Sequence, residues 1–120
     1  MNVTVLDHPL INHYMTIIRN KNTSSSEFKS LAKRVSILMW FEVFKELTVN
    51  DHKIETPIEN YDGIKINEPY PCLVSILRAG SIVVDGLSEV LPYCSTGYIG
   101  IFRDEKSLKP QTYFEKLPSN

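Results

Sequence analysis

The sequence predicts an α/β fold, in which an incomplete parallel sheet is flanked by helices and preceded by N-terminal helices and a β-hairpin. Two observations carry this prediction. Apolar residues recur at helical spacing through much of residues 8–47. Two short, nearly unbroken apolar runs, at 72–77 and 98–102, are typical of buried parallel strands. Because a third helical pattern lies between these runs, they form a βαβ unit, which has a right-handed crossover.

The same patterns divide a single partial domain, residues 1–120, into three regions. Residues 1–50 are a helical N-terminal region, residues 51–70 a hairpin arm, and residues 71–120 the start of the parallel-sheet core. A third buried strand is expected from Thr112 to Leu117. Three core strands are few for this fold class, and an open sheet edge is normally covered, so the sheet is expected to be incomplete in this chain.

Two helix starts and one turn are expected before the core. Asp7 is the expected cap of the first helix, with Pro9 in its first turn. Ser24 and Glu27 have the spacing of a capping box at the start of a long helix that runs to about Leu47. The hairpin strands are expected to flank a loop that ends in Asp62-Gly63, with one face packed and one face wet.

Composition limits the classes of partner. The formal net charge of -1 provides no global field for nucleic acid or an anionic membrane, so an anion site must be local. Cys72 and Cys94 lie in apolar runs and are interpreted as buried free thiols rather than a disulfide. There is no signal-peptide pattern and no apolar run of about 20 residues, so a cytoplasmic protein without a membrane partner is expected.

The most informative segment joins the first core strand to the next helix. Arg78 follows the strand directly, and the turn continues with two small residues, Ala79 and Gly80. Small residues let backbone N–H groups approach a ligand closely, and a helix start offers unpaired N–H groups to an anion. Open α/β sheets bind ligands at the carboxyl ends of their strands. The segment therefore predicts a site for phosphate or pyrophosphate; an ordinary turn with a solvated arginine is the alternative.

Arg103 ends the next expected strand in the same way. If the two strands are parallel, Arg78 and Arg103 emerge at the same edge of the sheet, where two guanidinium groups can hold a pyrophosphate by bidentate hydrogen bonds. The alternative is that Arg103 pairs at the surface with the neighbouring Asp104 or Glu105.

Several motifs occur together in a fixed order along nearly the whole chain. They are Val5 to Ile11, Thr16 to Ser24, Ile54 to Pro57, Ile76 to Gly80, Val84 to Gly86, Gly97 to Gly100, and Arg103 through Pro118. In this order and spacing the chain resembles the uracil phosphoribosyltransferases, of the type I phosphoribosyltransferase family. The resemblance implies an incomplete phosphoribosyltransferase-type sheet and a role in pyrimidine salvage, in which uracil and phosphoribosyl pyrophosphate give UMP and pyrophosphate.

The resemblance also implies the parts of the site. Arg78 and Arg103 are expected to contact phosphoribosyl pyrophosphate, with Ala79 and Gly80 as loop backbone. Magnesium is expected to be carried by the pyrophosphate of the substrate, with no protein ligand, and no catalytic residue is assignable. The N-terminal helices and hairpin are expected to help form a homodimer or to meet a complementing chain.

Other motifs of the family have no counterpart in residues 1–120. These are an acidic residue with the Thr/Gly-rich loop that holds the ribose 5-phosphate, and the segment that reads uracil. The chain is therefore expected to supply only the pyrophosphate-side half-site, to bind uracil only when the missing part is present, and to be inactive alone. A non-catalytic truncated relic, or a module for dimerisation and interaction, is the alternative.

Overall fold

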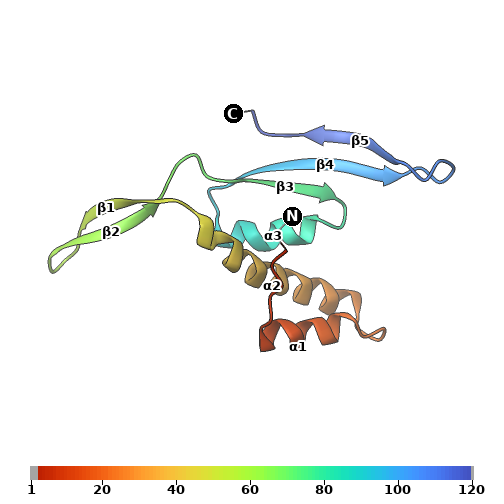
Figure 1. Ribbon diagram of the computed structural model, residues 1–120, viewed down its shortest axis with the longest axis horizontal. Coiled ribbons are helices and arrows are strands. Elements are labelled where there is room, and N and C mark those ends of the chain that lie inside the picture. Colours follow the sequence, from red (N-terminus) through yellow and green to blue (C-terminus); the bar gives the residue numbers. More distant parts are fainter. Residues whose placement is uncertain (1–2, 120) are drawn as a thin grey trace.

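The computed structural model describes residues 3–119. Its helices and strands occur in the order that the sequence predicts, and the α/β class is confirmed (Figure 1). In chain order the elements are α1 (Pro9–Ile18), α2 (Ser25–Val43), the 3-10 turn η1 (Phe44–Glu46), β1 (Val49–Glu55), β2 (Asn60–Ile66), β3 (Cys72–Leu77), α3 (Ser81–Val90), β4 (Ser95–Arg103) and β5 (Pro110–Lys116).

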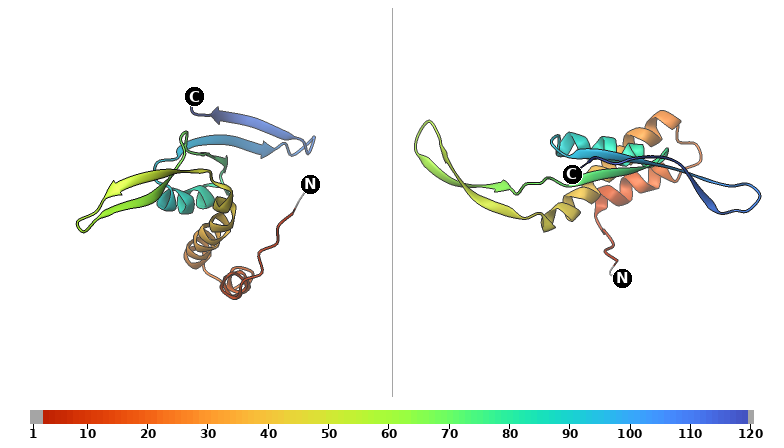
Figure 2. Two further views of the ribbon diagram at one scale, coloured as in Figure 1. Left: turned by 60° about the vertical axis from the view of Figure 1, so that its left-hand side comes forward. Right: turned by 90° about the horizontal axis from the view of Figure 1, so that it is seen from above.

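The three helices are stacked in successive layers. α3 packs on β3, α2 packs on α3, and α1 packs on α2 (Figure 1). The core between α3 and β3 is small and consists of Leu73, Val84 and Leu87. The radius of gyration is 18.6 Å, whereas a compact chain of this length has about 14 Å. The difference arises because the β1–β2 hairpin and the β4–β5 ribbon extend in opposite directions from the helices (Figure 2).

The two predicted helix starts have different outcomes. Ser24 caps α2, because its side-chain oxygen accepts the N–H of Glu27 at 3.2 Å. The prediction of Asp7 as the cap of α1 is wrong. His8 caps this helix, with its Nδ1 atom accepting the N–H of Leu10 at 3.2 Å. Asp7 lies one residue too early for this bond, and its carboxylate instead accepts the side-chain amide of Asn12 at 3.0 Å.

The hairpin exists, but its predicted turn is wrong. β1 and β2 are antiparallel from Val49↔Ile66 to Glu55↔Asn60, so Gly63 lies inside β2, opposite His52. The turn lies instead at residues 56–59. There the Thr56 hydroxyl accepts the N–H groups of Ile58 and Glu59, at 3.3 and 3.1 Å, and donates to the Glu59 carbonyl at 2.6 Å. This threonine satisfies the turn locally, and the strands therefore continue past Asp62-Gly63.

The expected packed face of the hairpin is also absent. Every residue of β1 is exposed, whichever face of the ribbon its side chain occupies. Figure 2 shows the reason, since the hairpin projects beyond the helical layers and lies over no other described element. Apolar and polar residues alternate along its strands, yet the apolar face has no surface to pack against within residues 3–119.

The sheet is mixed rather than wholly parallel. β3 and β4 are parallel, in register from Cys72↔Ser95 to Leu77↔Gly100. β5 runs antiparallel to β4 and is exposed along its whole length, so the prediction of a third buried parallel strand is wrong. The physical reason is the length of the connection. Only residues 104–109 join β4 to β5, whereas a parallel crossover needs a dozen or more residues.

Both cysteines are free thiols, but only one is partly buried. Cys94 packs against the core, and burial raises the pKa of its thiol, with a smaller contribution from Cys72. Cys72 is exposed, so the prediction of two buried thiols is wrong. Its side chain alternates with the buried Leu73 and therefore occupies the opposite face of the sheet from the helices. Across residues 3–119, no helix has the length and apolar character needed to cross a membrane.

Candidate anion-binding site

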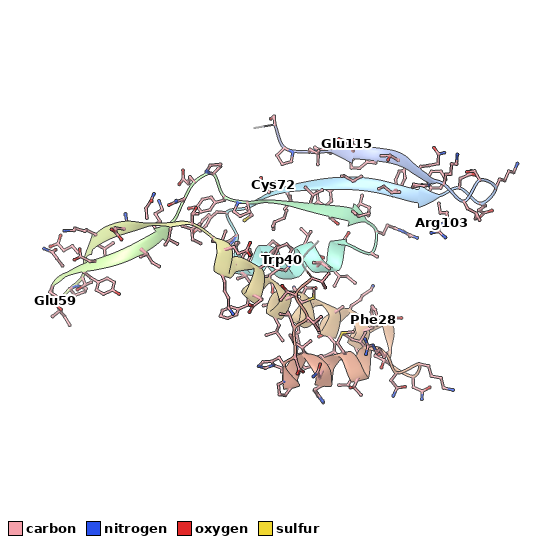
Figure 3. The ribbon with its side chains drawn as sticks, viewed as in Figure 1. Phe28, Trp40, Glu59, Cys72, Arg103 and Glu115 are labelled. Atoms are coloured by element: carbon pink, nitrogen blue, oxygen red, sulfur yellow. The ribbon has the colours of Figure 1, made fainter. Side chains whose placement is uncertain are left out.

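The parallel pairing of β3 and β4 brings the two predicted arginines to one edge of the sheet. Arg78 directly follows β3, and Arg103, which is labelled in Figure 3, is the last residue of β4. Their positions along the edge differ. Leu77, the residue before Arg78, is in register with Gly100, so Arg103 lies three residues beyond the end of β3, about 10 Å at roughly 3.3 Å per residue. Arg78 therefore lies at the carboxyl end of β3, whereas Arg103 lies at the end of the longer strand β4, which projects beyond β3.

The turn after β3 is held closely against the strand. The chain enters it through a cis peptide bond between Leu77 and Arg78. The N–H of Gly80 donates to the carbonyl of Ile76 at 2.9 Å. A Cβ atom on Gly80 would lie 2.6 Å from that carbonyl oxygen, so only glycine permits this contact. Gly80 was expected to offer loop backbone to a ligand, but its own N–H is already occupied and its role here is close packing.

Other backbone donors of the turn remain available. The N–H groups of Ala79 and Ile82 donate no hydrogen bond to any acceptor within residues 3–119. Ala79 lies in the turn just before Gly80, the N-cap of α3, and Ile82 lies in the first turn of this helix, whose N-terminus has no side-chain cap and no acidic residue in its first turn. Unpaired N–H groups at the positive end of a helix dipole attract anions. The role of Ala79 as loop backbone for a ligand stays a prediction.

A cavity of about 750 Å³ opens beside this turn, within the size range of small-molecule sites. Three elements contribute its walls. The turn and its flanks provide Leu77, Arg78, Ala79 and Ile82, α2 provides Lys29, and the β4–β5 ribbon provides Ile101, Phe102 and Tyr113. Two of these side chains are cationic and none is a carboxylate. The lining does not include Arg103 or Gly80, so the cavity unites only part of the predicted site.

Sequence reasoning missed the far walls of this cavity. Lys29 reaches it because α2 crosses α3, and no local pattern around Lys29 signals that contact. Tyr113 reaches it because β5 returns antiparallel, the feature that the sequence analysis predicted wrongly. Phe102 and Tyr113 form a tilted aromatic pair with ring centroids 6.1 Å apart, so the ribbon contributes an aromatic wall to the cavity.

The cationic side chains at this edge are not neutralised by the protein. Four ion pairs occur among residues 3–119, and none involves Lys29, Arg78 or Arg103. The alternative pairing of Arg103 with Asp104 or Glu105 therefore does not occur there. Asp104 has another function, because its carboxylate accepts the N–H groups of Ser107 and Lys106 at 2.6 and 3.2 Å. These bonds stabilise the charged form and lower the pKa of Asp104.

The donor set does not suit a metal held by the protein. No group of three or more His, Cys, Asp or Glu side chains able to bind a metal ion occurs among residues 3–119. The cavity itself offers cations, aromatic rings and aliphatic groups, whereas magnesium prefers carboxylate oxygens, phosphate oxygens and water.

The architecture defines an α/β protein with a cavity lined by cationic side chains at the carboxyl ends of its parallel strands. Comparison with known protein families shows to which family of α/β proteins the chain belongs. The model of the family "Uracil phosphoribosyltransferase" matches residues 5–120, and the chain belongs to this family.

Individual relatives agree with the family model. The chain is 47% identical over 116 residues to a uracil phosphoribosyltransferase of Pediococcus pentosaceus, covering 97% of this chain and 56% of the relative. It is 42% identical over 118 residues to that of Alkaliphilus oremlandii, covering 98% and 56%. The solved structure of the AQ2163 protein from Aquifex aeolicus superimposes with a TM-score of 0.86 at 30% identity, over 96% of this chain and 55% of that one. The chain thus spans about half the length of its relatives.

The cap formed by Asp104 predicts a pH-dependent loop. Because its pKa is lowered in the folded state, the carboxylate stabilises the loop above the pKa of the unfolded chain, and this contribution is lost as pH falls through the folded pKa. In an NMR titration, the amide shift of Ser107 should change with a midpoint below 3.8, the ordinary value for Asp104. Asp104→Ala should abolish this titration, and a wild-type midpoint at or above the ordinary value would contradict the assignment.

Proposed function

We propose that the cavity beside Arg78 holds the diphosphate of phosphoribosyl pyrophosphate, as the pyrophosphate-side half-site of a uracil phosphoribosyltransferase. The proposed reaction is the pyrimidine-salvage step in which uracil and phosphoribosyl pyrophosphate give UMP and pyrophosphate. One observation supports this proposal above the others. In a chain of this family, an uncompensated arginine and two unpaired N–H groups share a cavity whose lining contains no carboxylate.

The proposed chemistry follows from where charge develops. The bond between C1 of the ribose and the diphosphate oxygen breaks, and negative charge grows on the departing diphosphate. A guanidinium matches two phosphate oxygens by a bidentate fork, which is the proposed role of Arg78. The N–H of Ala79 adds a fixed donor, and Arg103 contributes from the end of β4. Donors positioned before reaction stabilise such charge without reorganising.

Magnesium belongs to the substrate in this proposal. The ion would enter bound to the diphosphate oxygens, because the cavity lining supplies no carboxylate to hold it. Its positive charge would add to that of Arg78 in balancing the leaving group. No residue of this chain is proposed as a ligand of the metal.

The whole reaction requires more than this cavity. The chain covers 56% of its relative from Pediococcus pentosaceus, and uracil binding is proposed to depend on residues outside the matched part. The isolated chain is therefore proposed to bind the diphosphate side without turnover. A cytoplasmic location and the absence of nucleic-acid and membrane partners stay predictions.

Ligand binding should be visible as a thermal shift. A ligand that binds only the folded state at a hundredfold excess over its Kd stabilises that state by about 2.7 kcal/mol. Phosphoribosyl pyrophosphate with magnesium should raise the Tm of the wild-type chain in differential scanning fluorimetry. Arg78→Ala should lose most of this shift, because the fork to the diphosphate is removed.

Arg34→Ala provides the matched control, since Arg34 is an exposed arginine of α2 that does not line the cavity. It should keep the full shift. Absence of any shift in the wild-type chain would refute the half-site. In an enzyme completed by the rest of the relative's sequence, Arg78→Ala should raise the barrier by roughly 2–4 kcal/mol, and a change below about twofold in turnover would exclude the proposed role.

Catalysis by the isolated chain is expected to be absent. With radiolabelled uracil, phosphoribosyl pyrophosphate and magnesium, chromatography should detect no UMP above a blank without protein. The reason is that no Thr/Gly-rich loop for the ribose 5-phosphate occurs in residues 1–120. UMP formation that scales with the concentration of this chain, and that disappears in Arg78→Ala, would show that the half-site alone is sufficient.

A second candidate function is supported by the hairpin. Apolar side chains of the β1–β2 arm are strongly exposed, with Ile58 at 93%, Ile64 at 70% and Tyr61 at 59%. Exposed apolar patches of this kind mark interaction surfaces. We propose that the arm contacts a second copy of the chain, so that the protein acts in dimerisation, with or without catalysis; a complementing chain is the other candidate partner.

This contact should depend on the apolar tip of the arm. Ile58→Ser with Ile64→Ser should lower the mass measured by sedimentation equilibrium from that of a dimer toward 13.8 kDa, the mass of one chain. Replacing the exposed Lys53 by Ser provides the control, because it changes the arm without removing apolar surface. A wild-type chain that sediments as a monomer at all concentrations tested would exclude a homodimer.

A further inference from the structure

A second cavity, of about 280 Å³, is formed by β3, α3 and Trp40 of α2. It shares no lining residue with the cavity beside Arg78. We propose that this second cavity, which we call the β3-edge cavity, binds a small neutral aromatic molecule that carries one hydrogen-bonding group. Such binding is independent of the proposed function, because none of the residues assigned to the diphosphate except the packing residue Gly80 lines this cavity.

The β3-edge cavity follows the free edge of β3. Within residues 3–119, β3 is the terminal strand of its sheet, and β4 occupies its other edge. The cavity meets five consecutive residues of the strand, from Cys72 to Ile76. Since successive side chains of a strand point to opposite faces of the sheet, a cavity that meets all five runs along the open edge. A molecule from solution can therefore reach it.

Ser75 gives this cavity a polar group without a partner. Leu73 and Ser75 are the two buried residues of β3, so both side chains face α3. Ser75 is only 1% exposed, and its Oγ atom has no hydrogen-bond partner among residues 3–119. A buried hydroxyl without a partner costs free energy. A ligand that carries one donor or acceptor would remove this cost, because a hydroxyl can both donate and accept.

Trp40 gives the cavity its aromatic surface. Trp40 packs against the core, and Phe44 stacks on it with ring centroids 5.6 Å apart, which holds the indole in place. Trp40 and Cys72, which lies at the first residue of β3, are both labelled in Figure 3. Most of the remaining lining is aliphatic.

The character and size of the lining define the ligand. No lining residue is an acid, a lysine or an arginine, so an ionised ligand would lose its hydration without compensation. An apolar cavity of about 150 Å³ is sufficient for benzene. A cavity of about 280 Å³ therefore accommodates one aromatic ring with a substituent.

Phenol is the probe for the test, and toluene, which has a similar ring without the hydroxyl, is the reference ligand. Trp40 is the only tryptophan of the chain, so its fluorescence should change saturably during titration with either ligand. Ser75→Ala should weaken phenol binding by about fivefold, the effect of one net hydrogen bond. It should not weaken toluene binding.

Ser36→Ala is the matched control. Ser36 is also buried, but its hydroxyl donates to the carbonyl of Ala32 at 2.8 Å, and it does not line the cavity. It should leave the affinity for phenol within about twofold of wild type. Ser75→Ala should not lower the Tm of the free chain, because it removes a hydroxyl that has no partner. A low Tm would identify a variant that fails through unfolding.

Alkylation of the cysteines locates the ligand. Cys72 is exposed and lines the cavity, whereas Cys94 is partly buried and does not. Bound phenol should slow the reaction of Cys72 with iodoacetamide, measured by peptide mass spectrometry, and leave the rate at Cys94 unchanged.

Four results would overturn the proposal. They are a fluorescence change that does not saturate, an equal loss of phenol and toluene binding in Ser75→Ala, alkylation of Cys72 that phenol does not slow, and protection of Cys72 that rises with protein concentration without phenol. The last result would show that a second copy of the chain covers the edge of β3. None of these results bears on the diphosphate site, which the thermal shift with phosphoribosyl pyrophosphate tests separately.

Discussion

The parallel pairing of β3 with β4 is the constraint on which the site depends. Parallel strands need a crossover, and here α3 makes it across one face of the sheet. The crossover begins at the carboxyl end of β3, so the N-terminus of α3 and the carboxyl ends of both strands necessarily share an edge. Arg78 and Arg103 lie at the same edge of the sheet for this reason. An antiparallel pair would have placed them at opposite ends.

Close packing at glycines then shapes the cavity at that edge. At Gly86, a Cβ atom would lie 3.0 Å from the backbone carbonyl of Lys33, so the absence of a side chain lets α2 approach α3 and brings Lys29 to the site. At Gly100, a Cβ atom would lie 2.6 Å from the ring of Tyr113, so the ring covers β4 and forms the aromatic wall. Two glycines on different elements, one in α3 and one in β4, thus set the distance between the walls.

The electrostatic character of the site comes from what surrounds it. The chain as a whole carries a formal net charge of -1, yet Lys29, Arg78 and Arg103 have no ionic partner within residues 3–119. Acidic residues are used elsewhere. Glu89 holds α2 to α3, and Asp104 closes the β4–β5 loop through the backbone of Ser107. A nearly neutral protein can therefore present a local cationic cavity.

Local sequence determined the elements with strong periodicity, the βαβ order, the Ser24 cap, and the turn that carries Arg78 and Ala79, because each depends on neighbours within a few residues. The motifs were also sufficient to predict the family. Weak local signals failed where alternatives competed, as at Asp62-Gly63, where the hydroxyl of Thr56 closes the turn instead, and at Asp7, where His8 provides the cap. Only the tertiary structure decided the return direction of β5, the aromatic wall and the position of Lys29. These features depend on contacts between elements far apart in the chain, and no pattern within one element records which partner it meets.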